Sequence, residues 1–105
     1  MRLDRDHAAE LLGRLKGRKV LVLGDLMLDE YLFGEVSRIS PEAPVPIVRV
    51  TKERWVLGGA ANVAANLVAI GATPLVVGTL QKDGAGERLM GIFARLGIAR
   101  DGLVL

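Results

Sequence analysis

The residues best suited to chemistry in this chain are two adjacent glycines, Gly58 and Gly59, followed three residues later by Asn62. Two glycines let a backbone turn sharply and leave room for a ligand against bare main chain. The segment that follows predicts a helix, whose first amides have no partner within it and can bind an oxygen-rich ligand. Asn62 adds one acceptor and two donors, which suits a pair of sugar hydroxyls. Close packing at the helix entry is the alternative explanation of the glycines.

Two carboxylates lie upstream, in residues 24–29 (GDLMLD). Asp29 follows the first predicted strand, at the edge of an α/β sheet where ligands bind. A carboxylate there can accept hydrogen bonds from two hydroxyls of a polyol, and such charge-assisted bonds are stronger than neutral ones. The residues alone leave open whether Asp29 binds a sugar or caps a turn. Asp25 lies closer to the strand, and we expect it to hold the loop through backbone amides.

Three segments in this order resemble the ribokinase-like (PfkB) carbohydrate kinases: residues 24–29, the proline-bearing run 37–46 (SRISPEAPVP) and residues 58–62 (GGAAN). The glycine-rich segment, with Gly71 after its helix, is typical of the whole superfamily. The run 37–46 is similar to the branch that phosphorylates D-glycero-β-D-manno-heptose 7-phosphate in lipopolysaccharide core synthesis.

This resemblance extends from about Lys19 to Gly97, most of the chain, with one departure. The family usually carries a Gly-x-x-Gly-x-Asp turn after the next strand, whereas residues 78–83 read GTLQKD, with Gln81 in place of the second glycine. The geometry of this turn is therefore left open by the sequence.

The resemblance implies an ATP-dependent sugar kinase that transfers the γ-phosphate to the anomeric hydroxyl, with Mg²⁺ shielding charge. It also implies that Asp29, Gly58, Gly59 and Asn62 line the sugar pocket. For Arg38 two roles stay open: reading the phosphate of the substrate with its planar guanidinium, and stabilising the neighbouring segment or lying in solvent. Another ribokinase-like sugar or nucleoside kinase, and a non-catalytic interaction module, are the alternatives.

Residues 84–87 (GAGE) imitate the Gly-Ala-Gly-Asp segment whose aspartate is the general base of this family. They follow an early strand, whereas the family motif lies far downstream, so we expect no catalytic role for them. The chain contains neither a Gly-x-x-x-x-Gly-Lys-Ser/Thr loop nor a Gly-x-Gly-x-x-Gly loop. We therefore expect no catalytic residue and no metal ligand here, with ATP and Mg²⁺ bound mainly by a missing C-terminal part.

The elements that must position these residues alternate between strands and helices. Apolar runs and glycine stops predict the following order: a helix from Asp4 or Asp6 to Gly17, a strand 19–24, a flap 29–56, a helix 59–70 closed by Gly71, a strand 74–78, a helix 84–96 capped by Asp83 and ended by Gly97, and a strand 103–105. We expect both early strands to be buried on two faces of a parallel α/β sheet. In the helix 84–96 we expect Leu89, Ile92, Phe93 and Leu96 to point inward.

The segment 29–56 predicts a small antiparallel β flap that stands off the main sheet. Prolines at positions 41, 44 and 46 exclude a central strand but suit an edge strand or the entry to one. Its apolar residues and strand edges predict a homodimer formed through the flap, as is common in the resembling family. For Trp55 two roles remain open: covering the sugar with its ring face, and packing within the flap.

Composition favours a globular domain, since 50% of the 105 residues are hydrophobic and only 4% aromatic. A net charge of +2, evenly scattered, argues against nucleic acid as a partner. The absence of cysteine excludes disulfides and thiolate metal sites. No apolar run approaches the roughly 20 residues that span a bilayer. We therefore expect a cytoplasmic location and no membrane contact.

The last predicted strand lies at the end of the chain with no helix after it. Three such strands make a poor complete sheet. We therefore expect residues 1–105 to be the N-terminal portion of a ribokinase-like sugar kinase domain, inactive by itself.

Overall fold

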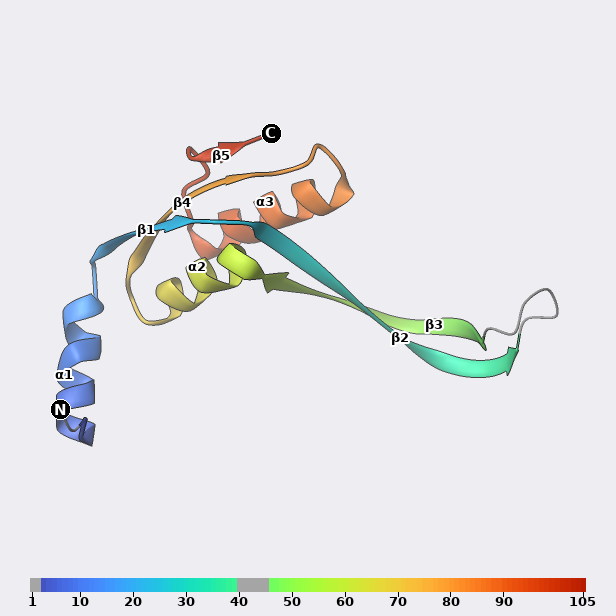
Figure 1. Ribbon diagram of the computed structural model, residues 1–105, viewed down its shortest axis with the longest axis horizontal. Helices are drawn as coiled ribbons and strands as arrows, with labels where there is room; N and C mark the ends of the chain where they lie inside the picture. Colours follow the sequence, from blue (N-terminus) through green and yellow to red (C-terminus); the bar gives the residue numbers. More distant parts are fainter. Residues whose placement is uncertain (1–2, 40–45) are drawn as a thin grey trace.

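The computed structural model describes residues 3–39 and 46–105 (Figure 1). The elements in chain order are α1 (Arg5–Leu15), β1 (Lys19–Leu23), β2 (Leu26–Ile39), β3 (Pro46–Gly58), α2 (Gly59–Ala69), β4 (Thr73–Thr79), α3 (Gly84–Leu96) and β5 (Leu103–Val104). Within the described residues, none of the helices is long and apolar enough to cross a bilayer.

Strands β1, β4 and β5 form a parallel sheet in that order, and β2 and β3 form a separate antiparallel pair. The connections from β1 to β4 and from β4 to β5 pass through α2 and α3 respectively. This is the predicted α/β architecture of a parallel sheet with flanking helices and an antiparallel flap.

The core lies between the parallel sheet and the two crossover helices. Val22 and Val76 are register partners on neighbouring strands, and both are buried against these helices. Ala61 and Ala64 of α2 are completely covered, so their small side chains let that helix lie close to the sheet. The buried members of this cluster are Val22, Ala61, Ala64, Val76, Leu80, Leu89, Phe93 and Ile98.

The opposite face of the sheet is open, which corrects the prediction that both early strands are buried on two faces. Leu21 and Leu23 are 64% and 74% exposed, and their register partners Leu75 and Val77 are exposed as well. Right-handed crossovers that advance in one direction across a sheet place their helices on the same face. The apolar residues of a strand show that both of its faces can be buried. Whether a face is buried depends on another element of the structure packing against it.

The helix ends follow the predicted capping residues. Asp4 accepts a hydrogen bond from the His7 amide at 2.7 Å and is the N-cap of α1. Asp83 accepts one from the Gly86 amide at 2.8 Å and caps α3. Gly71 and Gly97 end α2 and α3 with positive φ angles of 88° and 74°, which glycine adopts at little cost.

One helix face differs from expectation, and another helix is exposed. In α3, Leu89 and Phe93 are buried as predicted and Ile92 is half-buried, but Leu96 is 38% exposed. β5 pairs only with the end of β4, at Gly78 and Thr79, so the sheet beside the last turn of α3 is narrow. In α1 no residue is buried, and the helix stands apart from the sheet (Figure 1).

The antiparallel pair of β2 and β3, called the arm below, projects from the body of the molecule (Figure 1). Its strands are longer than the predicted flap 29–56, since pairing begins at Met27 opposite Gly58 and ends at Ile39 opposite Pro46. The molecule is consequently elongated, with extents of 60 × 37 × 22 Å. Pro46 lies at the entry of β3, as expected, whereas Pro41 and Pro44 lie outside the described residues.

Candidate functional site

A cleft opens where the parallel strands end. β1 and β4 are neighbours in a parallel sheet, so their carboxyl ends lie at the same edge, where open α/β sheets bind ligands. The cleft has a volume of about 450 Å³. It is lined by Asp25, Leu26, Met27, Leu28, Thr79, Leu80, Gln81, Asp83, Ala85, Gly86 and Leu89. It therefore offers carboxylate, hydroxyl and amide groups together with apolar side chains.

Asp29 and Gly58 meet where the arm joins the body, next in the chain or across the arm from Leu28 and Met27 of the cleft, but neither of them lines the cleft itself. A Cβ atom built on Gly58 would lie 2.5 Å from Oδ2 of Asp29, closer than real Cβ atoms approach an oxygen. Only a glycine at this position allows the carboxylate to lie against the main chain at the start of α2. The structure therefore provides an exposed carboxylate, packed against the buried Gly58 and one residue from the exposed Gly59, for the sugar-site hypothesis.

A glycine at position 59 is explained by close packing of the backbone, and not only by access for a ligand. Its φ angle of 56° lies in the left-handed region, and a Cβ there would lie 2.5 Å from the Asp25 carbonyl oxygen. That carbonyl accepts a hydrogen bond from the Ala60 amide at 2.8 Å, which fixes the first turn of α2 against the end of β1. The Asp25 backbone thus links the loop to α2, whereas its side chain, which was expected to hold loop amides, lines the cleft.

Asn62 lies in the first turn of α2 and is exposed, four residues after Gly58 in the same glycine-rich segment. Arg38 lies further along β2, with its backbone opposite Ile47. At the rise of an extended strand it is roughly 30 Å from Asp29. The side chain of Arg38 lies outside the described residues. The structure therefore gathers Asp29, Gly58, Gly59 and Asn62 at the base of the arm and places Arg38 near its tip.

The turn with Gln81 forms without the family glycine. None of the described residues other than glycine has a positive φ, so this turn does not require a left-handed residue at position 81. Glycine is required instead at Gly86, where a Cβ would overlap the Gln81 carbonyl oxygen. The amides of Gly86 and Glu87 both bond to Asp83, so residues 84–87 are a capped helix start, as expected, and not an anion hole.

Met27 is a site residue that the sequence reasoning did not identify. It faces Gly58 across the arm and lies beside Gly59, and it also lines the cleft. Its position two residues before Asp29 on the same strand was the available signal, because such residues share a face. Within the described part of the chain, no three His, Asp or Glu side chains are grouped closely enough to hold a metal ion.

The chain is similar in sequence to curated proteins of two names. It is 46% identical over 103 residues to the bifunctional protein HldE of Pelobacter propionicus, which covers 98% of this chain and 21% of that protein. It is 51% identical over 88 residues to the D-beta-D-heptose 7-phosphate kinase of Bordetella bronchiseptica, covering 84% and 28% respectively. The chain thus spans about a fifth to a quarter of these curated relatives. No protein-family model matches it.

Solved structures share the fold. The fructokinase of Xylella fastidiosa superposes with a TM-score of 0.60 at 26% identity, covering 82% of this chain and 24% of that one. The fructokinase of Halothermothrix orenii superposes with a TM-score of 0.56 at 21% identity, covering 83% and 28%. These likenesses confirm the predicted ribokinase-like α/β fold, with its parallel sheet and antiparallel pair.

Proposed function

We infer, because this chain is homologous to a segment of the ribokinase-like heptose 7-phosphate kinases, that it forms the sugar-binding wall of such a kinase. The substrate we propose is D-glycero-β-D-manno-heptose 7-phosphate, phosphorylated by ATP at its anomeric hydroxyl. The observation that carries the proposal is the Asp29 carboxylate, which lies against Gly58 where the arm joins the sheet edge.

In this proposal each residue at the base of the arm has a distinct role. Asp29 accepts hydrogen bonds from two sugar hydroxyls, which positions the ring. Gly58 leaves room for the Asp29 carboxylate, the exposed Gly59 keeps its main chain open to the sugar, and Asn62 supplies a further donor and acceptor. This places the sugar at the sheet edge without any proton transfer by the described residues.

ATP and Mg²⁺ belong to the proposed reaction, in which phosphoryl transfer depends on positioning and on electrostatic stabilisation. The described residues group no carboxylates for a metal ion. On the strength of the family resemblance, we propose that nucleotide and metal are bound mainly by parts of the enzyme outside this chain, and we expect residues 1–105 alone to be inactive. A cytoplasmic location remains a prediction from the sequence.

We also propose that the protein is a homodimer in which two arms pack against each other over the sugar sites. Exposed apolar residues on the arm support this: Tyr31, Leu32, Phe33 and Val50 are between 46% and 54% exposed. Arg38 would then approach the phosphate of a sugar held by the partner copy.

The test is sugar binding by the full-length protein, measured by calorimetry. Asp29→Ala should weaken affinity for heptose 7-phosphate by roughly 10- to 150-fold, because a charge-assisted hydrogen bond is lost. Asn62→Ala should have a smaller effect, and Asp101→Ala, an exposed carboxylate before β5, should have none.

Three outcomes separate the alternatives. Unchanged affinity in both Asp29→Ala and Asn62→Ala would show that the sugar binds elsewhere. Tighter binding of fructose, ribose or a nucleoside than of heptose 7-phosphate would favour another ribokinase-like kinase. Absence of any sugar binding, with assembly through the arm intact, would favour the interaction module.

A further inference from the structure

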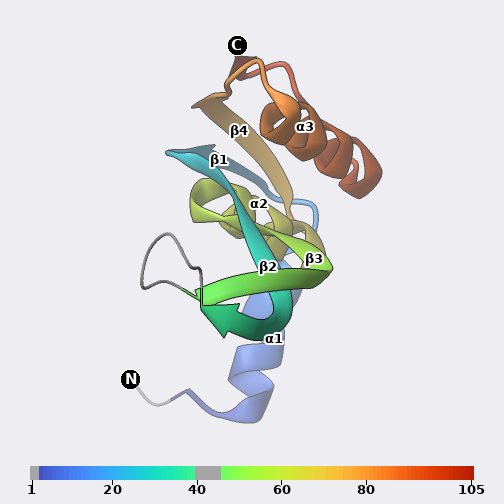
Figure 2. The ribbon, with the colours of Figure 1, turned by 90° about the vertical axis from the view of Figure 1, so that its right-hand side faces the viewer.

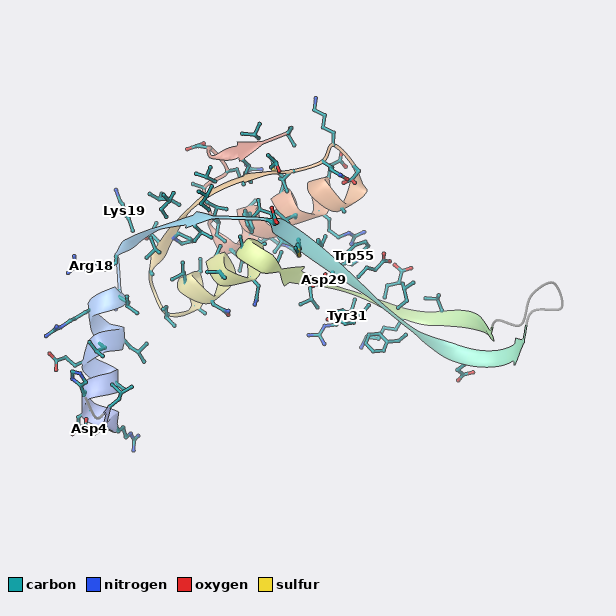
Figure 3. The ribbon with its side chains drawn as sticks, viewed as in Figure 1. Asp4, Arg18, Lys19, Asp29, Tyr31 and Trp55 are labelled. Atoms are coloured by element: carbon teal, nitrogen blue, oxygen red, sulfur yellow. The ribbon has the colours of Figure 1, made fainter. Side chains whose placement is uncertain are left out.

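Arg88 of α3 lies over the ring of Trp55 in β3, with its Cζ atom 4.4 Å from the ring centroid. A guanidinium within about 6 Å of an indole face is attracted by the ring quadrupole. Trp55 is half-buried, and Figure 3 shows it close to Asp29 on the part of the arm nearest the body. The contact therefore joins the arm to a helix of the core.

The pairing of the arm shows which face this contact holds. Residues directly opposite each other in an antiparallel pair share a face, and neighbours along a strand alternate. Trp55 is opposite Glu30, whereas Asp29 is opposite Val56, so Trp55 and Asp29 lie on opposite faces. The ring of Trp55 is therefore turned away from Asp29, which favours the packing role over the role of a sugar cover.

The face of Trp55 continues the face by which the arm packs on the core. Leu28 and Leu57 are cross-strand partners on that face, and both pack against the buried cluster. Trp55 is the next residue of β3 on the same face, one step further from the body. The Arg88 contact thus extends the anchoring of the arm just past the level of Asp29.

We propose that Arg88 is a positioning residue: by holding Trp55 it fixes the base of the arm, and with it the Asp29 carboxylate, against the sheet edge. Its helix is well suited to this, because α3 is anchored by the buried side chains of Leu89 and Phe93 and by the Asp83 cap. The Arg88 guanidinium therefore extends from a helix that is anchored in the core to the arm, which stands out from the core. The effect on sugar binding rests on the proposed function, whereas the effect on the arm does not.

The expected size of the effect follows from the strength of such contacts at exposed sites. Removing the cation should shift the ratio of held to released arm by roughly 2- to 5-fold. If the sugar binds only when the arm is held, the apparent dissociation constant rises at most by the same factor, because it scales with the inverse of the competent fraction.

The first test uses the fluorescence of Trp55, the single tryptophan of the chain. Arg88→Gln removes the charge and keeps a polar side chain, so acrylamide should quench Trp55 more strongly and emission anisotropy should fall. Arg88→Lys retains a cation and should restore most of the wild-type signal. Arg95→Gln changes another exposed arginine of the same helix and should leave the signal unchanged. Circular dichroism confirms that every variant has the wild-type helix content.

The second test measures sugar affinity and turnover of the same variants in the full-length protein. We expect Arg88→Gln to raise KM by up to about 5-fold with kcat little changed, with rescue by Arg88→Lys. Wild-type quenching and anisotropy in Arg88→Gln would overturn the contact. Altered fluorescence with unchanged KM would overturn the positioning role. If the wild-type protein binds no sugar, the proposed function fails and the fluorescence alone decides whether Arg88 holds the arm.

Discussion

At the scale of single residues, the two positions Gly58 and Gly59 favour glycine for different physical reasons. Gly59 is required by its backbone, since its φ is 56° and the Asp25 carbonyl lies where a side chain would be. Gly58 is favoured by a neighbouring side chain, because Oδ2 of Asp29 lies 2.5 Å from where a Cβ would be and would have to move to admit one. Packing and ligand access were posed as alternatives for this pair. The structure supports packing at Gly58, which is buried beside the Asp29 carboxylate, whereas Gly59 is exposed and leaves its main chain accessible.

This gives a prediction for Gly58→Ala. The new methyl group would lie 2.5 Å from Oδ2 of Asp29 and must displace that carboxylate. We expect sugar affinity to fall by roughly 10-fold or more, approaching the effect of Asp29→Ala, because the same charge-assisted bond is lost. The measurement is calorimetry on the full-length protein.

The matched control is Gly13→Ala, in the exposed interior of α1, where nothing lies within 4 Å of the new Cβ. It should leave sugar affinity unchanged. Equal affinity for Gly58→Ala and the wild type would mean that the position of the Asp29 carboxylate does not matter for binding.

At the scale of elements, helix α3 supports both the cleft and the arm. Its N-terminus is tied to the end of β4 by the Asp83 cap and by the close approach of Gly86 to the Gln81 carbonyl. Its interior packs through Leu89 and Phe93, and Arg88 contacts the arm. One helix therefore connects the sheet edge, the cleft wall and the base of the arm.

Two glycines of α3 should respond oppositely to the same substitution. Gly91→Ala adds a methyl group in open space and should raise the free energy of unfolding by about 0.5–1 kcal/mol, because glycine weakens a helix interior. Gly86→Ala must push the Gln81 backbone away, so it should lower stability by about 1–3 kcal/mol. Denaturant unfolding followed by circular dichroism measures both, and stabilisation by Gly86→Ala would show that the helix entry is less tightly packed than described.

At the scale of the whole molecule, two apolar surfaces lack a covering layer within the described residues. One is the open face of the parallel sheet around Leu21, Leu23, Leu75 and Val77. The other is the arm, which carries exposed aromatic and aliphatic side chains and whose strands β2 and β3 form a pair separate from β1 and β4 (Figure 2). Exposed strand edges and apolar patches of this kind commonly mark surfaces that pair with other chain segments.

The proposed dimer predicts that a charge on the arm disrupts assembly. Leu32→Lys places an ammonium at a side chain that is 54% exposed on the arm, and should convert a dimer to a monomer in light scattering. Leu12→Lys is a close match on α1, where the leucine is 52% exposed, and should leave the mass unchanged. A wild-type monomer, or a dimer that tolerates Leu32→Lys, would contradict assembly through the arm.

The sequence by itself determined the features that depend only on neighbouring residues, such as helix caps, helix ends and the order of the elements. The caps at Asp4 and Asp83, the glycine stops at Gly71 and Gly97, and the order of strands and helices were all predictable, because each depends on neighbouring residues. The association of residues 58–62 with Asp29 was predictable only through the family resemblance. Carboxylate and glycines lie far apart in the chain, and no local pattern pairs them.

Only the tertiary structure decided which surfaces are covered and which side chains meet. The strand 19–24 reads as buried on both faces, yet Leu21 and Leu23 are exposed because both crossover helices lie on the other side. The contact of Arg88 with Trp55 joins segments that the sequence treats as unrelated. Burial and contact depend on how distant elements pack, whereas propensity and capping act within a few residues. This difference in range is the physical reason for the division.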